Sequence, residues 1–74
     1  MPGAIAQSTL LENVKRNPNE AKNLCQEFRK LNSKGVSASS PEAIDEIARK
    51  KNLNSTEAEI LSIYVIALHC PDVN

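Results

Sequence analysis

Residues 54–69 read NSTEAEILSIYVIALH, and this stretch decides the fold. Asn54 and Glu57 have the spacing of a capping box, in which each side chain accepts a hydrogen bond from the other residue's backbone N–H. A helix is therefore expected to begin there, and Pro71 predicts that it ends at about His69. At 100° per residue this helix is apolar nearly all round, which is unusual for a helix at the surface of a small domain.

Two apolar stripes and one narrow polar strip run along this predicted helix. The first stripe consists of Leu61, Tyr64, Val65 and Leu68. The second consists of Ile60, Ile63 and Ala67. The polar strip holds Glu59, Ser62 and His69, and Ile66 interrupts it. Such a helix has to be covered by the rest of its chain or by a partner. We expect three short companion helices to leave part of it open, and the residues predicted to bind a partner are Ile60, Ile63, Ile66 and Ala67.

Three shorter helices are expected before this one. The steps Asn17-Pro18 and Ser40-Pro41 each supply a capping residue and then a proline, whose missing N–H costs nothing at the first helical position. Gly35 allows a left-handed turn between them. The prediction is an all-α fold, a compact bundle of four short helices with a central hydrophobic C-terminal helix. We expect a flexible N-terminus over residues 1–8, one helical domain over residues 9–70 and a C-terminal tail over residues 71–74.

Composition and charge exclude several classes of protein. The 74 residues include nine Lys or Arg and nine Asp or Glu, so the formal net charge is zero, which argues against a nucleic-acid binder. No segment reaches the roughly 20 apolar residues of a membrane span. The N-terminus shows no export signal, and small secreted scaffolds normally carry several cysteine pairs. We therefore expect a cytoplasmic protein in which Cys25 and Cys70 are reduced thiols, rather than one that contains a single disulfide.

No arrangement of residues predicts catalysis or a cofactor. The candidate metal ligands are His69, Cys70, Asp72 and the distant Cys25, and they contain no CxxC pair. His69 and Cys70 point about 100° apart on a helix and are not a catalytic dyad; they are expected at a frayed helix end. Cys25 is expected to be a small buried side chain. We expect no catalytic, cofactor-binding or metal-binding residues, and no enzyme activity.

Several short motifs resemble the Nif11-like domain family. They are Leu10-Leu11, Val14, Asn17-Pro18, Ile47-Ala48, residues 52–56 and Glu59-Ile60, within about residues 9 to 61. The resemblance implies a small, helical, cytoplasmic bacterial protein. Some relatives serve as leader segments on which a peptide-modifying enzyme docks. Asn52 stands where that pattern has a turn glycine, and residues 34–40 look like an insertion. The residues of this chain that match the family pattern are Asn17, Pro18, Ala48 and Thr56. We expect all four to have structural roles.

Two functions from different classes follow from these observations. The first is a small non-enzymatic protein–protein interaction or regulatory module, which forms a homodimer or binds an unidentified protein through its last helix. The alternative is a DNA-binding helix-turn-helix regulator that uses residues 41–69, because their apolar spacing fits much of that unit. Glu57 and Glu59 argue against it, since they would face phosphates in the reading helix.

Overall fold

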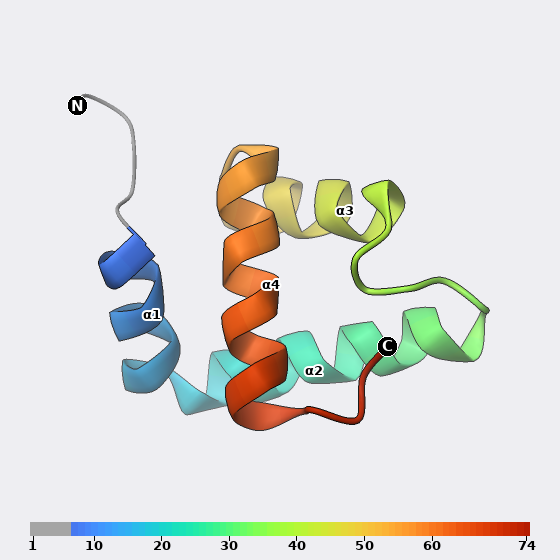
Figure 1. The fold of residues 1–74 in the computed structure, drawn as a ribbon, viewed down its shortest axis with the longest axis horizontal. Helices are drawn as coiled ribbons and strands as arrows, with labels where there is room; N and C mark the ends of the chain where they lie inside the picture. Colours follow the sequence, from blue (N-terminus) through green and yellow to red (C-terminus); the bar gives the residue numbers. More distant parts are fainter. Residues whose placement is uncertain (1–6) are drawn as a thin grey trace.

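The computed structural model describes residues 7–74, and these residues form four α-helices and no strand (Figure 1). The helices are α1 (Gln7–Arg16), α2 (Pro18–Ser33), α3 (Pro41–Lys51) and α4 (Ser55–His69). The predicted all-α bundle is therefore confirmed. Helix α1 begins at Gln7, within the expected flexible N-terminus, and the remainder of that expected segment lies outside the described residues.

Helix α4 is the centre of the bundle, because it packs against each of the other three helices. In Figure 1 its first turns lie beside α3, and its last turns cross in front of α2. Side chains from all four helices meet in one core, among them Val14, Phe28, Ile47, Leu61 and Val65. Full burial of side chains of this size contributes about 1.5–3 kcal/mol each, so this core is what holds the helices together.

The start of α4 has the predicted capping box. The Asn54 side-chain oxygen accepts a hydrogen bond from the Glu57 backbone N–H at 2.8 Å, and the Glu57 carboxylate accepts one from the Asn54 N–H at 3.1 Å. Helix α3 ends just before this box at Asn52, which takes a left-handed conformation with φ of 56°. Asparagine tolerates this conformation, so a short turn can redirect the chain from α3 into α4.

The two proline steps also begin helices as predicted. Pro18 and Pro41 are the first residues of α2 and α3, and the Ser40 hydroxyl accepts a hydrogen bond from the Ala43 N–H at 3.2 Å. Gly35 has the expected positive φ, 82°, directly after α2.

The expected capping role of Asn17 is wrong, because its side-chain amide donates to the Asn13 carbonyl at 3.0 Å and no side-chain cap forms at α2. The proline marks the start of α2, whereas a proline and a cap together mark the start of α3.

Two residues of α4 lie differently from the prediction. Ser62 is expected in the exposed polar strip, but it is buried. Its hydroxyl tolerates burial because it donates a hydrogen bond to the Ala58 carbonyl at 2.8 Å. Leu68 was assigned to a buried stripe, but it is 50% exposed. It lies in the last turn of α4, where the described residues leave its side of the helix uncovered.

We expect replacement of Asn54 by alanine to destabilise the fold by about 1 kcal/mol, because the N–H of Glu57 loses its acceptor. Urea unfolding followed by circular dichroism measures the change. Thr56→Ala is the matched control, since Thr56 is an exposed residue in the same helical turn. Equal stability of the two variants would contradict a stabilising role for the capping box.

Candidate interaction surface

One side of α4 is apolar and only partly covered by the rest of the chain, and we call it the outer face. It consists of Ile60, Ile63, Tyr64, Ile66, Ala67 and Leu68. At 100° per residue Ile63, Ala67, Ile60 and Tyr64 are neighbours and lie opposite the buried side, which carries Ala58, Leu61 and Val65. The other two lie at its edges, where Glu59 falls between Ile66 and Ile63, and Leu68 lies beside Leu61. Ile63 is 58% exposed, so the largest part of its side chain remains in contact with water.

The four side chains predicted to bind a partner all lie on this outer face. Ile63 and Ala67 are exposed, whereas Ile60 and Ile66 are half-buried. Ile66 packs partly against the core. The prediction omitted Tyr64 and Leu68, although helical spacing from Ile60 could have placed Tyr64 beside it.

A groove runs beside the outer face, between α3 and α4. It is formed by two adjoining hollows of about 720 and 80 Å³, which share Ser39, Ile44 and Glu59. Its apolar lining includes Ile44, Ile63 and Ile66. Its acidic lining is Glu42, Asp45 and Glu59. We call this feature the α3–α4 groove, and it joins the outer face through Ile63 and Ile66.

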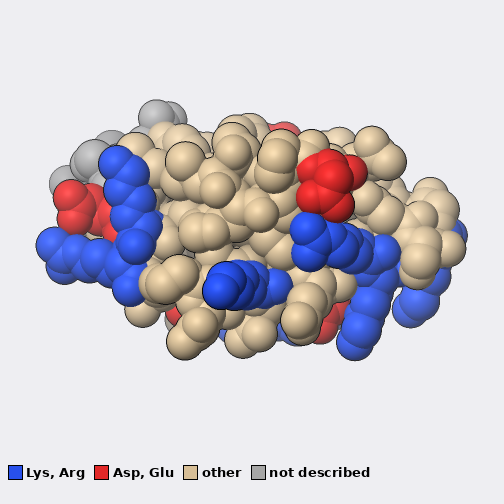
Figure 2. Space-filling view, turned by 90° about the horizontal axis from the view of Figure 1, so that it is seen from below, with Lys and Arg blue, Asp and Glu red and all other residues tan. Residues whose placement is uncertain are grey.

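The underside of the molecule, along α1 and α2, is rich in Lys and Arg (Figure 2). Seen from below, Lys and Arg side chains are prominent over α1 and α2, while Asp and Glu reach this side in few places (Figure 2). Uncharged side chains fill much of the upper middle of the same view. The zero net charge of the chain therefore hides an uneven distribution of charge over its surface.

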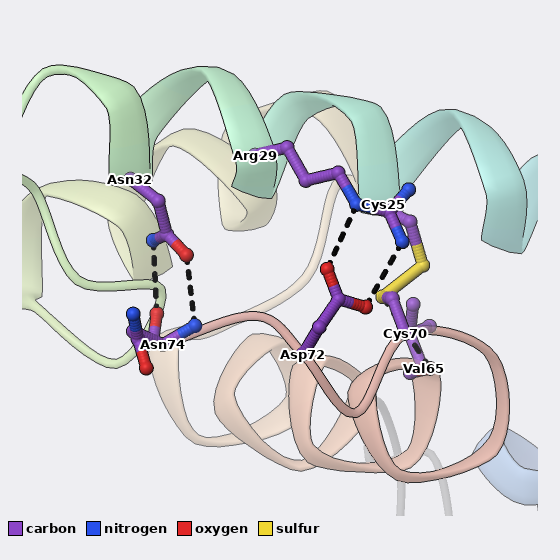
Figure 3. A network of polar contacts seen from close by, with 7 residues as sticks. All are labelled: Cys25, Arg29, Asn32, Val65, Cys70, Asp72 and Asn74. Atoms are coloured by element: carbon purple, nitrogen blue, oxygen red, sulfur yellow. Dashed lines mark hydrogen bonds and ion pairs between the residues drawn. A yellow bond between two sulfur atoms is a disulfide. The ribbon is translucent and has the colours of Figure 1, made fainter.

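Residues 70–74, which we call the C-terminal strap, hold the end of α4 on α2 (Figure 3). Its contacts lie on successive turns of one side of α2. Cys70 is bonded to Cys25, Asp72 pairs with Arg29, and Asn74 pairs with Asn32. Cys25, Arg29 and Asn32 are four and three residues apart, and this spacing places them on one helix face. Val73 of the strap is buried in the core, so the expected tail 71–74 packs on the domain.

Asn32 connects the strap to the segment that leads into α3. Its amide donates to the Asn74 and Val36 carbonyls at 3.0 Å each, and its carbonyl accepts from the Asn74 N–H at 2.8 Å. The Ala38 N–H also donates to the Asn74 carbonyl at 2.7 Å. The small-residue segment between α2 and α3 is therefore held by the strap, with Ala38 buried.

The cysteines form a disulfide, so the expectation of reduced thiols is wrong. Their sulfurs are 2.08 Å apart, and both residues are buried. The expectation relied on the usual number of cysteine pairs in secreted scaffolds, whereas the packing of α4 across α2 brings these two residues together. Cys70 is also not at a frayed end, because the bridge and full burial fix its position.

Metal ligands do not gather within the part of the chain that the structure describes. No group of three His, Cys, Asp or Glu side chains there is arranged to hold a metal ion. Of the candidates considered from the sequence, Cys25 and Cys70 are bonded to each other, and Asp72 pairs with Arg29. These contacts assign Cys25, Cys70 and Asp72 to holding the strap.

The ion pair between Arg29 and Asp72 is bidentate, and both side chains are exposed. Arg29 donates from Nε to Oδ2 at 3.2 Å and from Nη2 to Oδ1 at 3.0 Å. The hydrogen bond from Arg29 lowers the pKa of the Asp72 carboxyl below its ordinary value of 3.8. Because both groups are exposed, this pair positions the strap more than it stabilises the fold.

Fold and surface together define a small all-α domain in which one helix face is left open. The chain belongs to the family described as Domain of unknown function (DUF8664), whose model matches residues 11–70. This match corrects the resemblance to Nif11-like domains, because nothing in the comparison indicates that family. The motifs behind that resemblance are helix caps and core positions, which many small helical proteins share.

No curated protein and no solved structure matches the chain. Among the described residues, no helix is long and apolar enough to cross a membrane.

We expect reduction of the disulfide to destabilise the fold by about 4 kcal/mol, because the bridge closes a loop across a sequence separation of 45. Urea unfolding with and without a dithiol reductant measures this change, with thiol titration to verify reduction. The double variant Cys25→Ala/Cys70→Ala is the control and should not respond to reductant. Unchanged stability of the fully reduced chain would contradict the expectation.

We expect Arg29→Gln to raise the pKa of Asp72 towards 3.8, because the largest cause of its lowering is removed. The contribution of the pair to stability is present above this ordinary pKa and is lost as pH falls through the lowered pKa of the folded state. NMR titration of the Asp72 carboxyl carbon measures the change. Arg49→Gln, which removes a different exposed ion pair, should leave the Asp72 titration unchanged.

Proposed function

We propose that this chain is a small non-enzymatic interaction module that forms a homodimer through the outer face of α4. The observation that carries the proposal is the 58% exposure of Ile63 on a face that it shares with Ile60, Tyr64 and Ala67. Exposed apolar side chains are common singly, but a contiguous face on one helix favours a docking role. A second copy offers an equally apolar surface, and a two-fold axis brings the same face of both copies together.

The size of the outer face favours a weak dimer. Helix α4 has 15 residues and is therefore about 22 Å long. One face of such a helix covers on the order of a few hundred Å² per copy, which is below the roughly 800 Å² per partner of a standard interface. Burial at about 25 cal/mol per Å² still contributes several kcal/mol before the costs of association are subtracted.

The DNA-binding alternative over residues 41–69 remains a prediction. In that arrangement α4 would be the reading helix, yet its sequence has no Lys or Arg. Its outward side is apolar and carries Glu59, which phosphates would repel. A gel shift with random duplex at about 50 mM salt tests this alternative, because phosphate contacts dominate nonspecific affinity.

The expected cytoplasmic location also remains a prediction. The Cys25–Cys70 disulfide is of a kind that persists in oxidising compartments and is rare in the cytosol. Fractionation of the native host, followed by thiol labelling of the chain, tests the location and the redox state together.

We expect Ile63→Lys to give a folded monomer, because a charge on the outer face opposes dimer formation while the core stays intact. Light scattering over a range of protein concentrations measures the mass, and circular dichroism measures the helical content. The matched control is Asn23→Lys, which adds the same charge at an exposed position of α2. An Ile63→Lys variant that still dimerises, or a wild-type chain that is monomeric at every concentration, would overturn the proposed function.

A further inference from the structure

The α3–α4 groove has an excess of negative charge. Its acidic part lies beside the first turns of α4, at the end of that helix opposite to the strap (Figure 1). Asp45 pairs with Arg49, whereas Glu42 and Glu59 are exposed and have no ion pair within the described residues. No described Lys or Arg lines either of the two hollows that form the groove. The groove therefore favours a positively charged side chain of a partner.

The positive ends of α3 and α4 also border this groove, but they do not reverse its charge. Each of the two helices already has an acidic residue in its first turn, Glu42 in α3 and Glu57 in α4. A carboxylate in the first turn offsets the positive end of a helix dipole. An anion would therefore meet carboxylates at both helix starts, whereas a cation would not be repelled there.

The α4 side of the groove is one flank of that helix. Its residues are spaced by four, three and four positions, so they follow one another along the flank: Ser55, Glu59, Ser62 and Ile66. Ile63 lies one turn after Glu59 and also lines the groove. A segment that lies along this flank therefore meets a carboxylate and two isoleucines within two helical turns.

The inner hollow of the groove, of about 80 Å³, suits an apolar side chain. Its apolar lining is Ala38, Ile44, Ile63 and Ile66. Its two hydroxyls already have partners inside the chain. Ser62 donates to the Ala58 carbonyl at 2.8 Å, and the hydroxyls of Ser39 and Ser37 share a hydrogen bond of 2.9 Å. An aliphatic group gains from burial here, whereas an inserted amide or hydroxyl would lose water without a free hydroxyl to bond.

We propose that the α3–α4 groove binds a segment of a partner protein in which an aliphatic side chain lies beside a lysine or an arginine. The aliphatic side chain fills the inner hollow, and the cation reaches Glu42 and Glu59. The apolar stem of the cationic side chain lies along the groove between them. This site does not require the homodimer, because neither glutamate belongs to the outer face, although Ile63 and Ile66 border both surfaces.

The expected affinity is low. A short segment in this groove covers much less than the roughly 800 Å² per partner of a standard interface. Each exposed ion pair changes a dissociation constant by up to about fivefold. Binding should also weaken as salt rises, since exposed charges are screened.

Peptide selection followed by NMR tests the proposal. A random peptide library displayed on phage is selected against the immobilised chain at physiological salt, and the consensus peptide is synthesised. We expect Lys or Arg next to Leu, Ile or Val in the consensus. When this peptide is added to ¹⁵N-labelled chain, the amide signals of Asp45, Glu59 and Ile66 are expected to shift. Light scattering of the same samples records any change of mass.

Variants of the chain and of the peptide provide matched comparisons. Glu59→Gln should weaken binding by up to about fivefold. Glu46→Gln should leave it unchanged, because it removes the same charge from a position on α3 that does not line the groove. In the peptide, glutamate in place of the cation, or asparagine in place of the aliphatic residue, should each abolish the shifts. Circular dichroism verifies that each variant of the chain is folded.

The opposite outcomes overturn the groove as a site for a basic segment. They are a selection without a consensus, a consensus without a basic residue, shifts confined to other surfaces, or equal effects of Glu59→Gln and Glu46→Gln. Signals of Glu42 and Asp45 that change when the chain alone is diluted would indicate a second copy in the groove, which also overturns the proposal.

The homodimer is tested separately by light scattering and Ile63→Lys. A monomeric chain that binds the peptide overturns the homodimer alone, and a dimer that binds no basic peptide overturns the groove alone.

Discussion

The arrangement of this domain depends on the burial of α4 by three helices that are too small to enclose it. Leu61 and Val65 are buried by the other helices, whereas the apolar residues on the opposite side of the same helix are covered only in part. A helix that is apolar nearly all round gains free energy from each side that is removed from water. The core thus accounts for the fold, and the uncovered remainder accounts for the proposed interaction.

The strap has a different role from the core, because it holds the end of the central helix on α2. A chain of this length buries a limited fraction of its surface, and small domains often compensate with covalent bridges. Here the Cys25–Cys70 bridge joins the end of α4 to α2, and Arg29 and Asn32 hold the residues that follow. Because the strap is bonded along α2, the last turns of α4 keep a fixed position on that helix.

Membership of the DUF8664 family places this chain among domains whose function has not been established. The proposal therefore depends on the geometry of this molecule. A partly uncovered apolar helix face and an acidic groove beside it are features of one surface.

The sequence by itself determined the all-α class, the starts of α2, α3 and α4 and the chain reversal at Gly35, because caps, prolines and a positive φ depend on neighbouring residues. It also located the open side of α4 at Ile63, since helical spacing is a local property. Only the tertiary structure decided that Ser62 is buried, that Leu68 is exposed and that Cys25 meets Cys70. Those outcomes depend on which helix crosses which, and contacts between residues 45 positions apart leave no local pattern in the sequence.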